Sequence, residues 1–202
     1  METFVTRPHA LEIRRADVDT NLFDQIQRLR YQVYCVERNF LDASRYPEGR
    51  ESDEFDDSSI HYCAVDTSGC ITAAVRLVLH GNHGFPLLRY CSLYPQELDA
   101  IRRAPLRSAE VSRLVMSRNR GDHSGTKVAL QLYRELFRTA RLLGVTQLIA
   151  ASERSLVRLL NRDHINSRQI GPESQFSGSV TPYATPVSTL AGAPKPLCSI
   201  AA

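Results

Sequence analysis

The sequence predicts a mixed α/β domain, in which helices cover a mostly antiparallel sheet. Three observations predict it: an amphipathic helix over residues 19–36, two adjacent β-rich runs at 61–66 and 70–79, and a long amphipathic helix at 126–144 with further strand-like segments around it. The resulting order of helix, hairpin, strand, long helix, strand, helix and strand requires a mixed sheet with helices on its faces.

The first half begins with a helix that follows the capping candidates Asp19 and Thr20. Apolar residues recur along it at three- and four-residue intervals, namely Leu22, Phe23, Ile26, Leu29 and Val33. The acidic stretch "EGRESDEFDD" at residues 48–57 comes next. The runs "HYCAVD" and "CITAAVRLVL" follow, and the short Gly-containing connection between them predicts an antiparallel hairpin.

The second half starts with an irregular segment that contains Pro86 and Pro95, after which "AEVSRLVMS" predicts another strand. The long helix is "TKVALQLYRELFRTARLLG", which has a buried row at four-residue spacing, a basic opposite side and Gly144 as its stop. A strand "TQLIAA", a helix "RSLVRLLNRD" and an extended stretch "TPYATPVST" complete the pattern. We expect one domain over residues 1–190 and a flexible tail over 191–202.

Composition excludes several function classes. The 25 basic and 22 acidic residues give a net charge of +3, which is too small to indicate a nucleic-acid partner. The five cysteines form no C-x-x-C pair, which suits reduced thiols in the cytoplasm. The N-terminal residues contain no long apolar run, so no integral membrane segment is expected. His80 and His83 have no further ligand cluster, so they predict a polar turn and no metal site.

Arginines occur where the pattern expects apolar side chains. Arg30 follows Ile26 by four residues, on or beside the apolar stripe of its helix. Arg76 shares a strand face with Ala74 and Val78. Arg113 lies three residues after Glu110, so the two share a face only if a bulge shifts the alternation.

These inward arginines require counter-charges, because an unpaired buried guanidinium destabilises a protein by roughly 3–5 kcal/mol. The available carboxylates are those of Glu51, Asp53, Asp56 and Glu110. The acidic stretch is therefore expected to fold inward against the arginines. The alternative is that the carboxylates are solvated and that each arginine extends from a sheet edge into water.

The motifs "RYQVYCVERNF", "ESDEFDD", "AVRLVL" and "AEVSRLVMS" resemble those of acyl-homoserine-lactone synthases and the related N-acyl amino acid synthases, in order and approximate spacing. The similarity spans roughly residues 30–116 within a pattern that resembles the GNAT acyltransferase fold. In the lactone synthases, such motifs form a charged cluster around the amino acceptor site. The resemblance assigns to that cluster Arg30, Tyr34, Glu51, Asp53, Asp56, Arg76, Glu110, Ser112 and Arg113, with Phe40 at a position that is typically tryptophan.

Three stretches modify this resemblance. "RLVLHGNHGFP" lacks the proline-threonine sequence that usually follows the strand arginine in lactone synthases, while the run from "LVRLLNRDH" onward is similar to acyltransferases associated with PEP-CTERM/exosortase gene systems. In "RNRGDHSG", Arg118 and Gly121 match the start of the loop that binds coenzyme A pyrophosphate, but His123 stands where Gly or Ala belongs.

The resemblance implies an N-acyltransferase that moves a fatty acyl group from an acyl carrier protein thioester to the amine of an amino acid or related small molecule. The alternatives are an acyl-homoserine-lactone synthase and an acyl-coenzyme A-dependent GNAT enzyme. The acyl-phosphopantetheine thioester is then a donor, and no permanently bound cofactor is expected. We expect the acyl carrier protein to dock on Arg118, Arg120 and Lys127, where basic residues gather before the long helix.

Direct aminolysis needs no protein nucleophile, only an unprotonated amine, alignment and donors for the oxyanion. Glu51 is the candidate to accept the amine proton, and Glu110 and Arg113 complete the predicted catalytic set. The other cluster members are expected to bind substrate. A rival is a cysteine nucleophile, because Cys63 and His61 share a strand face, although a buried cysteine is usually inert. A non-enzymatic binding module is a third class.

Overall fold

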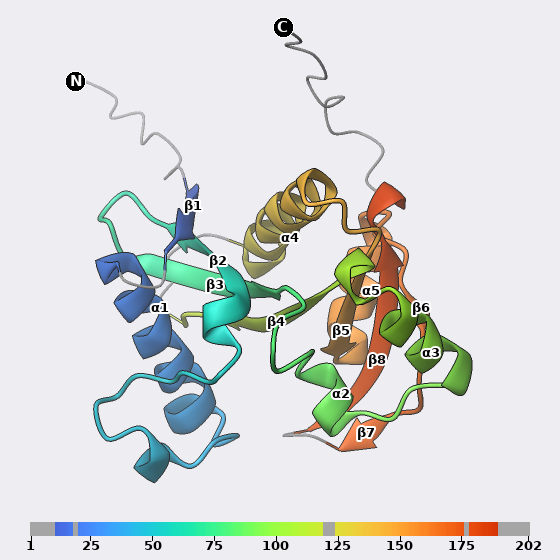
Figure 1. Ribbon diagram of the computed structural model, residues 1–202. Coiled ribbons are helices and arrows are strands. Elements are labelled where there is room, and N and C mark those ends of the chain that lie inside the picture. The colour runs from blue at the N-terminus through green and yellow to red at the C-terminus, as the bar shows by residue number, and fades with distance from the viewer. Residues whose placement is uncertain (1–10, 18–19, 119–123, 176–177, 190–202) are drawn as a thin grey trace, which may run out of the picture. The chain divides into compact units, whose positions relative to one another are not determined.

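The computed structural model describes residues 11–17, 20–118, 124–175 and 178–189 (Figure 1). Its α-helices are α1 (Asn21–Tyr31), α2 (Leu87–Tyr90), α3 (Pro95–Arg103), α4 (Gly125–Leu142) and α5 (Arg154–Arg162). Its strands are β1 (Glu12–Ala16), β2 (Ser59–Val65), β3 (Ile71–Val78), β4 (Ser108–Met116), β5 (Gln147–Ser152), β6 (Arg168–Gln169), β7 (Ser174–Gln175) and β8 (Ser179–Pro186).

The strands follow the hydrogen-bonding order β1-β2-β3-β4-β5-β8-β6, and β7 pairs with β8 outside this path. β4 and β5 are parallel, with Ser108 opposite Gln147, whereas β1 with β2 and β5 with β8 are antiparallel. The predicted mixed, mostly antiparallel sheet with helices is therefore confirmed. None of the described helices is long and apolar enough to cross a membrane.

The chain forms two compact units, one from residues 1–76 and 113–132 and the other from residues 77–112 and 133–202. In the first unit, the Thr20 side chain caps α1 by accepting a hydrogen bond from the Phe23 N–H at 3.3 Å. Thr20 is thus confirmed as a cap, while the other candidate, Asp19, lies outside the described residues. The last turns of this helix widen into a π-helix, η1 (Gln32–Glu37), in which the Arg38 N–H reaches the Val33 carbonyl at 3.0 Å.

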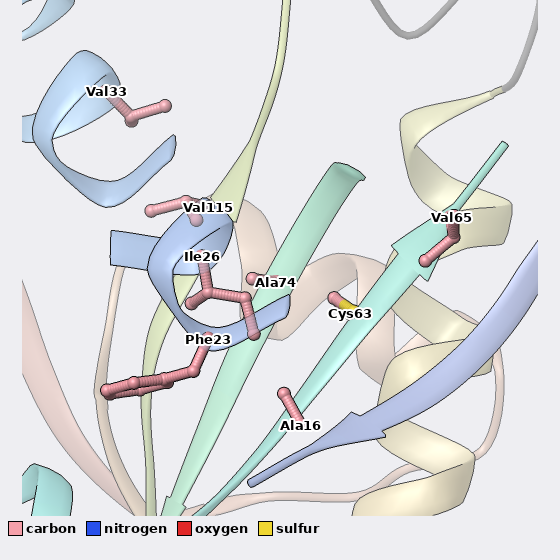
Figure 2. Packing of buried hydrophobic residues seen from close by; sticks show 8 residues of the cluster. All are labelled: Ala16, Phe23, Ile26, Val33, Cys63, Val65, Ala74 and Val115. Carbon is pink, nitrogen blue, oxygen red and sulfur yellow. The ribbon is translucent and has the colours of Figure 1, made fainter. Parts of the chain in front are cut away.

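The core of the first unit lies between α1 and the strands (Figure 2). Phe23 and Ile26 of α1 belong to one buried cluster with Cys63 of β2 and Ala74 of β3. The cluster is completed by Ala16, Val33, Val65 and Val115. The apolar residues spaced three and four apart along α1 thus pack against apolar residues on one face of the strands, as the sequence predicts.

The second unit is built around β5 and β8, which pair over six positions from Gln147–Pro186 to Ser152–Thr181. The turn before β4 joins them, because the Thr146 N–H donates to the Arg107 carbonyl at 2.9 Å. At Gly171 a Cβ atom would lie 2.1 Å from the Ser92 carbonyl oxygen, so only glycine allows this close backbone approach.

Sequence interpretation missed several elements, among them α3 and β1. The segment predicted to be irregular contains α3, which begins with Pro95 in its first turn and ends with Arg102 and Arg103. This is the arrangement that helix termini favour, so Pro95 marked a helix start that we interpreted as a break. β1 was also missed, because only Ala16 among its five residues is buried and its alternation is weak.

Candidate active site

The first unit brings the predicted arginines and acidic residues together. Arg30 comes from α1, Arg76 from β3 and Arg113 from β4. Their guanidinium groups converge on the carboxylates of Glu51, Asp53 and Asp56, which lie in the segment before β2. We call these six residues the charged cluster. The acidic stretch therefore does fold inward, as the buried arginines predicted.

Arg30 extends the apolar stripe of α1 by one turn and is 1% exposed. Its Nε donates to Glu51 Oε2, and its Nη1 donates to Asp56 Oδ1 at 2.8 Å. The backbone fixes the same contact, because the Glu51 N–H donates to the Gln27 carbonyl at 3.1 Å. Glu51 itself is wholly buried, so this part of the cluster is closed to solvent.

Arg76 is also wholly buried, and it holds the acidic segment from the side of the sheet. Its Nη1 donates to Asp53 Oδ1 and, at 2.8 Å, to Asp56 Oδ1, while its Nη2 lies 3.0 Å from Asp53 Oδ2. Burial alone would raise the pKa of Asp56, but Arg30 and Arg76 outweigh it and hold that pKa far below its ordinary value. The pKa of Asp53 is lowered in the same way, against its own burial, by Arg76 and Arg113.

Arg113 is the cluster arginine that reaches solvent, with 19% of its side chain exposed. Its Nη2 donates to Glu51 Oε1 at 3.0 Å and to Asp53 Oδ2 at 2.9 Å. Its backbone has a left-handed φ of 53° inside β4, so the regular strand geometry is interrupted at this residue.

The charged cluster is balanced, with three guanidinium groups against three carboxylates. His61 adds no charge near neutral pH, because burial lowers its pKa to about 4. Three buried nitrogens lack a hydrogen-bond partner among the described residues: Arg30 Nη2, Arg113 Nε and His61 Nδ1. All three atoms are buried, and Arg113 is the one of these residues whose side chain is partly exposed, at 19%.

Tyr34 borders Arg113, and Phe40 stacks on Tyr34. The Arg113 guanidinium carbon lies 5.4 Å from the centre of the Tyr34 ring, and Tyr34 stacks on Phe40 with ring centres 6.5 Å apart and planes 23° apart. The Tyr34 carbonyl accepts the Phe40 N–H at 2.7 Å, which fixes the turn after η1. Partial burial raises the pKa of Tyr34, so its hydroxyl stays protonated near neutral pH.

Glu110 and Ser112 lie in the part of β4 that belongs to the second unit. Glu110 is 3% exposed and its Oε2 accepts the backbone N–H of Leu87 at 2.8 Å, at the first residue of α2. Ser112 is half-buried. The Glu110 carboxylate thus orders the segment before α3 within its own unit.

The predicted carrier-binding residues are only partly described. Arg118 is exposed, and its Nε lies 3.1 Å from Glu37 Oε2 at the end of η1. Lys127 is exposed in the first turn of α4. Arg120, Gly121 and His123 lie outside the described residues.

The rival nucleophile does not have the environment it needs. Burial raises the pKa of Cys63 to about 12, so its sulfur is a thiol at neutral pH. His61 is turned toward the charged cluster, with Nε2 3.4 Å from the Asp56 carbonyl oxygen and its ring 4.6 Å from that of Phe23. Among the described residues, no group of His, Cys, Asp and Glu could hold a metal ion.

Sequence reasoning did not place His61 in the site. Its alternation with Cys63, which lies in the core facing α1, was the available signal, because it puts His61 on the face that α1 covers. The π-helix that carries Tyr34 had no such signal, since a single widened turn leaves the apolar spacing almost unchanged.

Comparisons with known proteins agree with this fold and show the family. The model of the family described as N-acyl amino acid synthase FeeM matches residues 25–186. The solved structure of FeeM, an N-acyl amino acid synthase from uncultured soil microbes, is similar with a TM-score of 0.70 and 17% identity, over 89% of this chain and 91% of that one.

Two acyl-homoserine-lactone synthases are similar in fold as well. BjaI, a CoA-dependent synthase solved with SAM and isopentyl-CoA, has a TM-score of 0.68 and 23% identity, over 90% of this chain and 87% of its own. LasI has a TM-score of 0.67 and 17% identity, over 92% and 95%. These likenesses support the GNAT-like architecture. Because the family model covers most of the chain, the protein belongs to the N-acyl amino acid synthase FeeM family and is an acyltransferase.

Proposed function

We propose that the protein transfers a fatty acyl group from an acyl carrier protein thioester to the amine of an amino acid or a related small molecule. One observation carries the proposal: a buried set of paired charges presents at its border one arginine, Arg113, whose side chain is 19% exposed and contacts two carboxylates. Buried ion pairs are weak evidence for stability, so their retention suits a site that must hold a group in one orientation.

The buried members of the charged cluster position the two that reach solvent. Arg113 and Asp53 have 19% and 16% of their side chains exposed, whereas Arg30, Glu51 and Arg76 have 1% or less. We assign the exposed part of the Arg113 guanidinium to the acceptor's own carboxylate, as a charge-assisted hydrogen bond. Asp53 is then the carboxylate that an acceptor amine reaches directly, with Tyr34 and Phe40 as the apolar border.

The reaction forms a C–N bond and breaks the C–S bond of the thioester. The amine must lose a proton, and the departing thiolate must gain one. Both Glu51 oxygens accept guanidinium hydrogen bonds and its side chain is buried, so as the proposed base it would act through a water molecule. We assign the main chain of β4 to the acyl carbonyl and Glu110 to ordering β4 and the segment after β3.

Product analysis tests this function. We would extract lipids from cells that express the wild-type chain, or its Glu110→Gln variant, and identify acylated products by mass spectrometry. Glu110→Gln keeps the shape and an acceptor oxygen for the Leu87 N–H, so folding is expected to be nearly unchanged while the transfer rate falls. Acyl amino acids made only by the wild type support the proposal. Acyl-homoserine lactones would replace it with the lactone-synthase alternative, and carrier binding without any product would indicate a binding module.

The donor is tested by kinetics with the same acyl chain on acyl carrier protein and on coenzyme A. We propose that the carrier docks on Arg118, Arg120 and Lys127, so Arg118→Glu should raise the apparent KM for the carrier and reduce its salt dependence. The Arg118 pairing with Glu37 makes Glu37→Gln a matched control, because it frees the arginine without reversing its charge. Equal use of the coenzyme A thioester, with no salt effect, would overturn the carrier assignment.

Association with a PEP-CTERM/exosortase system and a cytoplasmic location are further parts of the proposal.

A further inference from the structure

Three protruding leucines gather at one end of the second unit. Leu106, Leu142 and Leu143 are 74%, 71% and 50% exposed, and they are three of the six large hydrophobic residues that the structure exposes among its described residues. Leu106 lies in the short helix Pro105–Arg107, whereas Leu142 and Leu143 lie at the end of α4. The two places are adjacent, because the Arg107 carbonyl accepts both the N–H and the hydroxyl of Thr146, at 2.9 and 3.2 Å.

Arginines flank these leucines in the sequence. The segments 100–108 and 136–147 contain no acidic residue and five arginines, namely Arg102, Arg103, Arg107, Arg138 and Arg141. All five are exposed. Among the described residues, Arg138 alone of the five forms an ion pair, with Glu135 at 2.7 Å on the same helix. We call the three leucines and five arginines the Leu–Arg surface.

We propose that the Leu–Arg surface docks the enzyme on an anionic lipid bilayer. Exposed leucines with exposed arginines on the same two segments match the two components of peripheral membrane binding, which are insertion of apolar side chains at the headgroup level and attraction to anionic lipids. The leucines extend from turns and from a helix end, and a bilayer accepts such side chains without a matching pocket. A soluble acidic partner would neutralise the arginines but would have to supply apolar pockets for all three.

The composition of the chain beyond Thr189 is compatible with a lipid bilayer on the Leu–Arg surface. The Val187 N–H donates to the Thr146 carbonyl at 2.9 Å, so the described chain ends beside the Leu–Arg surface. Residues 190–202 carry one lysine, no acidic residue and the apolar residues Leu190, Leu197 and Ile200. A segment of this composition offers no counter-charge to five arginines, whereas anionic headgroups do.

The test is co-sedimentation of the full chain with phosphatidylcholine vesicles that contain or lack phosphatidylglycerol. We expect binding to the anionic vesicles at least about tenfold stronger than to the neutral ones, decreasing with salt. The double variant Leu142→Ser/Leu143→Ser should reduce binding about tenfold or more, because both side chains would insert. Exposure of both residues means that the melting temperature and acyl transfer should not change. Val36→Ser, at a 55% exposed residue of the first unit, is the matched control.

The charge contribution has its own matched pair. Arg103→Glu/Arg141→Glu and Arg15→Glu/Arg28→Glu both change the net charge from +3 by −4 to −1, but only the first pair belongs to the Leu–Arg surface. We expect binding to be lost with the first and mostly kept with the second. Equal losses, or no preference for anionic vesicles, would overturn the proposal. A dimer that Leu142→Ser/Leu143→Ser dissociates, or binding lost only with Leu197→Ser/Ile200→Ser, would also overturn it.

Discussion

The inner face of α1 carries two regions that are equally buried and chemically opposite. Ile26 and Arg30 are both 1% exposed, but Ile26 contacts apolar side chains whereas Arg30 contacts two carboxylates. Burying apolar groups stabilises a fold by roughly 0.8 kcal/mol per methylene. Burying a charge destabilises it until every partner is in place.

This difference teaches where function constrains the fold. Each contact in the apolar region contributes independently, so small changes there should have small effects. Members of the charged cluster share partners: Asp56 Oδ1 accepts from both Arg30 and Arg76, and Glu51 accepts from both Arg30 and Arg113. Removing one member therefore leaves others unsatisfied, and a fold without a functional need for this arrangement could use apolar residues in its place.

The largest effect is expected from Arg76→Ala. It removes the guanidinium between Asp53 and Asp56, so the free energy of unfolding should fall by about 3–5 kcal/mol and acyl transfer should be lost. Arg76→Lys should recover only part of both, because lysine lacks the planar fork. Urea unfolding and a transfer assay on each variant provide the measurement. Wild-type turnover with an unchanged unfolding midpoint would contradict the shared-partner account.

The next largest effect is a dependence of the free energy of unfolding on pH. It is caused by His61, which contacts both the charged cluster and the apolar region. Its Nε2 lies 3.8 Å from Asp56 Oδ1 and its ring packs on Phe23. Burial lowers its pKa from 6.5 to about 4, so below pH 6.5 the unfolded chain binds a proton that the folded chain does not. The free energy of unfolding should therefore fall by roughly 3 kcal/mol between pH 6.5 and pH 4.

Urea unfolding at a series of pH values measures this loss, and His61→Gln is the control, since its stability should be nearly flat across the same window. The carboxylates act at lower pH. The folded pKa values of Asp53 and Asp56 are depressed, so the stability they contribute is present above about pH 4 and is lost as the pH falls further. An identical slope in wild type and His61→Gln would assign the acid sensitivity to other groups.

A smaller effect is expected in the apolar region. Ile26→Val removes one buried methylene, which should lower the free energy of unfolding by about 0.5–1.5 kcal/mol. Transfer activity per folded molecule should stay at the wild-type level, because Ile26 packs in the apolar cluster with Phe23 and Ala74 and carries no polar group of the charged cluster. If this variant lost activity as Arg76→Lys does, the two regions would not be separable.

The contrast also explains how far the sequence alone could reach. The spacing of apolar residues along α1 and their alternation in β2 and β3 are local sequence patterns. These elements and the inward position of Arg30 and Arg76 were therefore predictable. The inward acidic stretch followed from charge balance. Its exact pairing did not, because which carboxylate meets which arginine depends on the backbone path of residues 51–56, where no periodic pattern constrains the chain.

Other features lay beyond sequence reasoning for equally physical reasons. The left-handed φ of Arg113 is imposed by tertiary contacts, since a local preference would have selected glycine or asparagine. β1 is short and mostly exposed, so its own residues carry little signal, and its pairing with β2 defines it. In α3, a proline at the start and charged residues near both ends were present. Its two large apolar residues, Leu98 and Ile101, were too few to form a recognisable stripe.

The smallest effect on stability is expected at the exposed border of the charged cluster, from Arg113→Lys. Glu51 and Asp53 each keep a buried arginine when Arg113 changes, and the positive charge is retained, so the free energy of unfolding should fall by less than about 1 kcal/mol. The left-handed backbone strain is the same for arginine and lysine. Acyl transfer should nevertheless fall steeply, with the loss in KM for the acceptor, because lysine lacks the planar fork that can hold the two cluster carboxylates and a substrate carboxylate at once. Steady-state kinetics with varied acceptor, alongside urea unfolding, separates the two outcomes. A loss of stability as large as that of Arg76→Lys, with normal kinetics in the folded fraction, would make Arg113 one more structural member of the cluster and would move the acceptor site elsewhere.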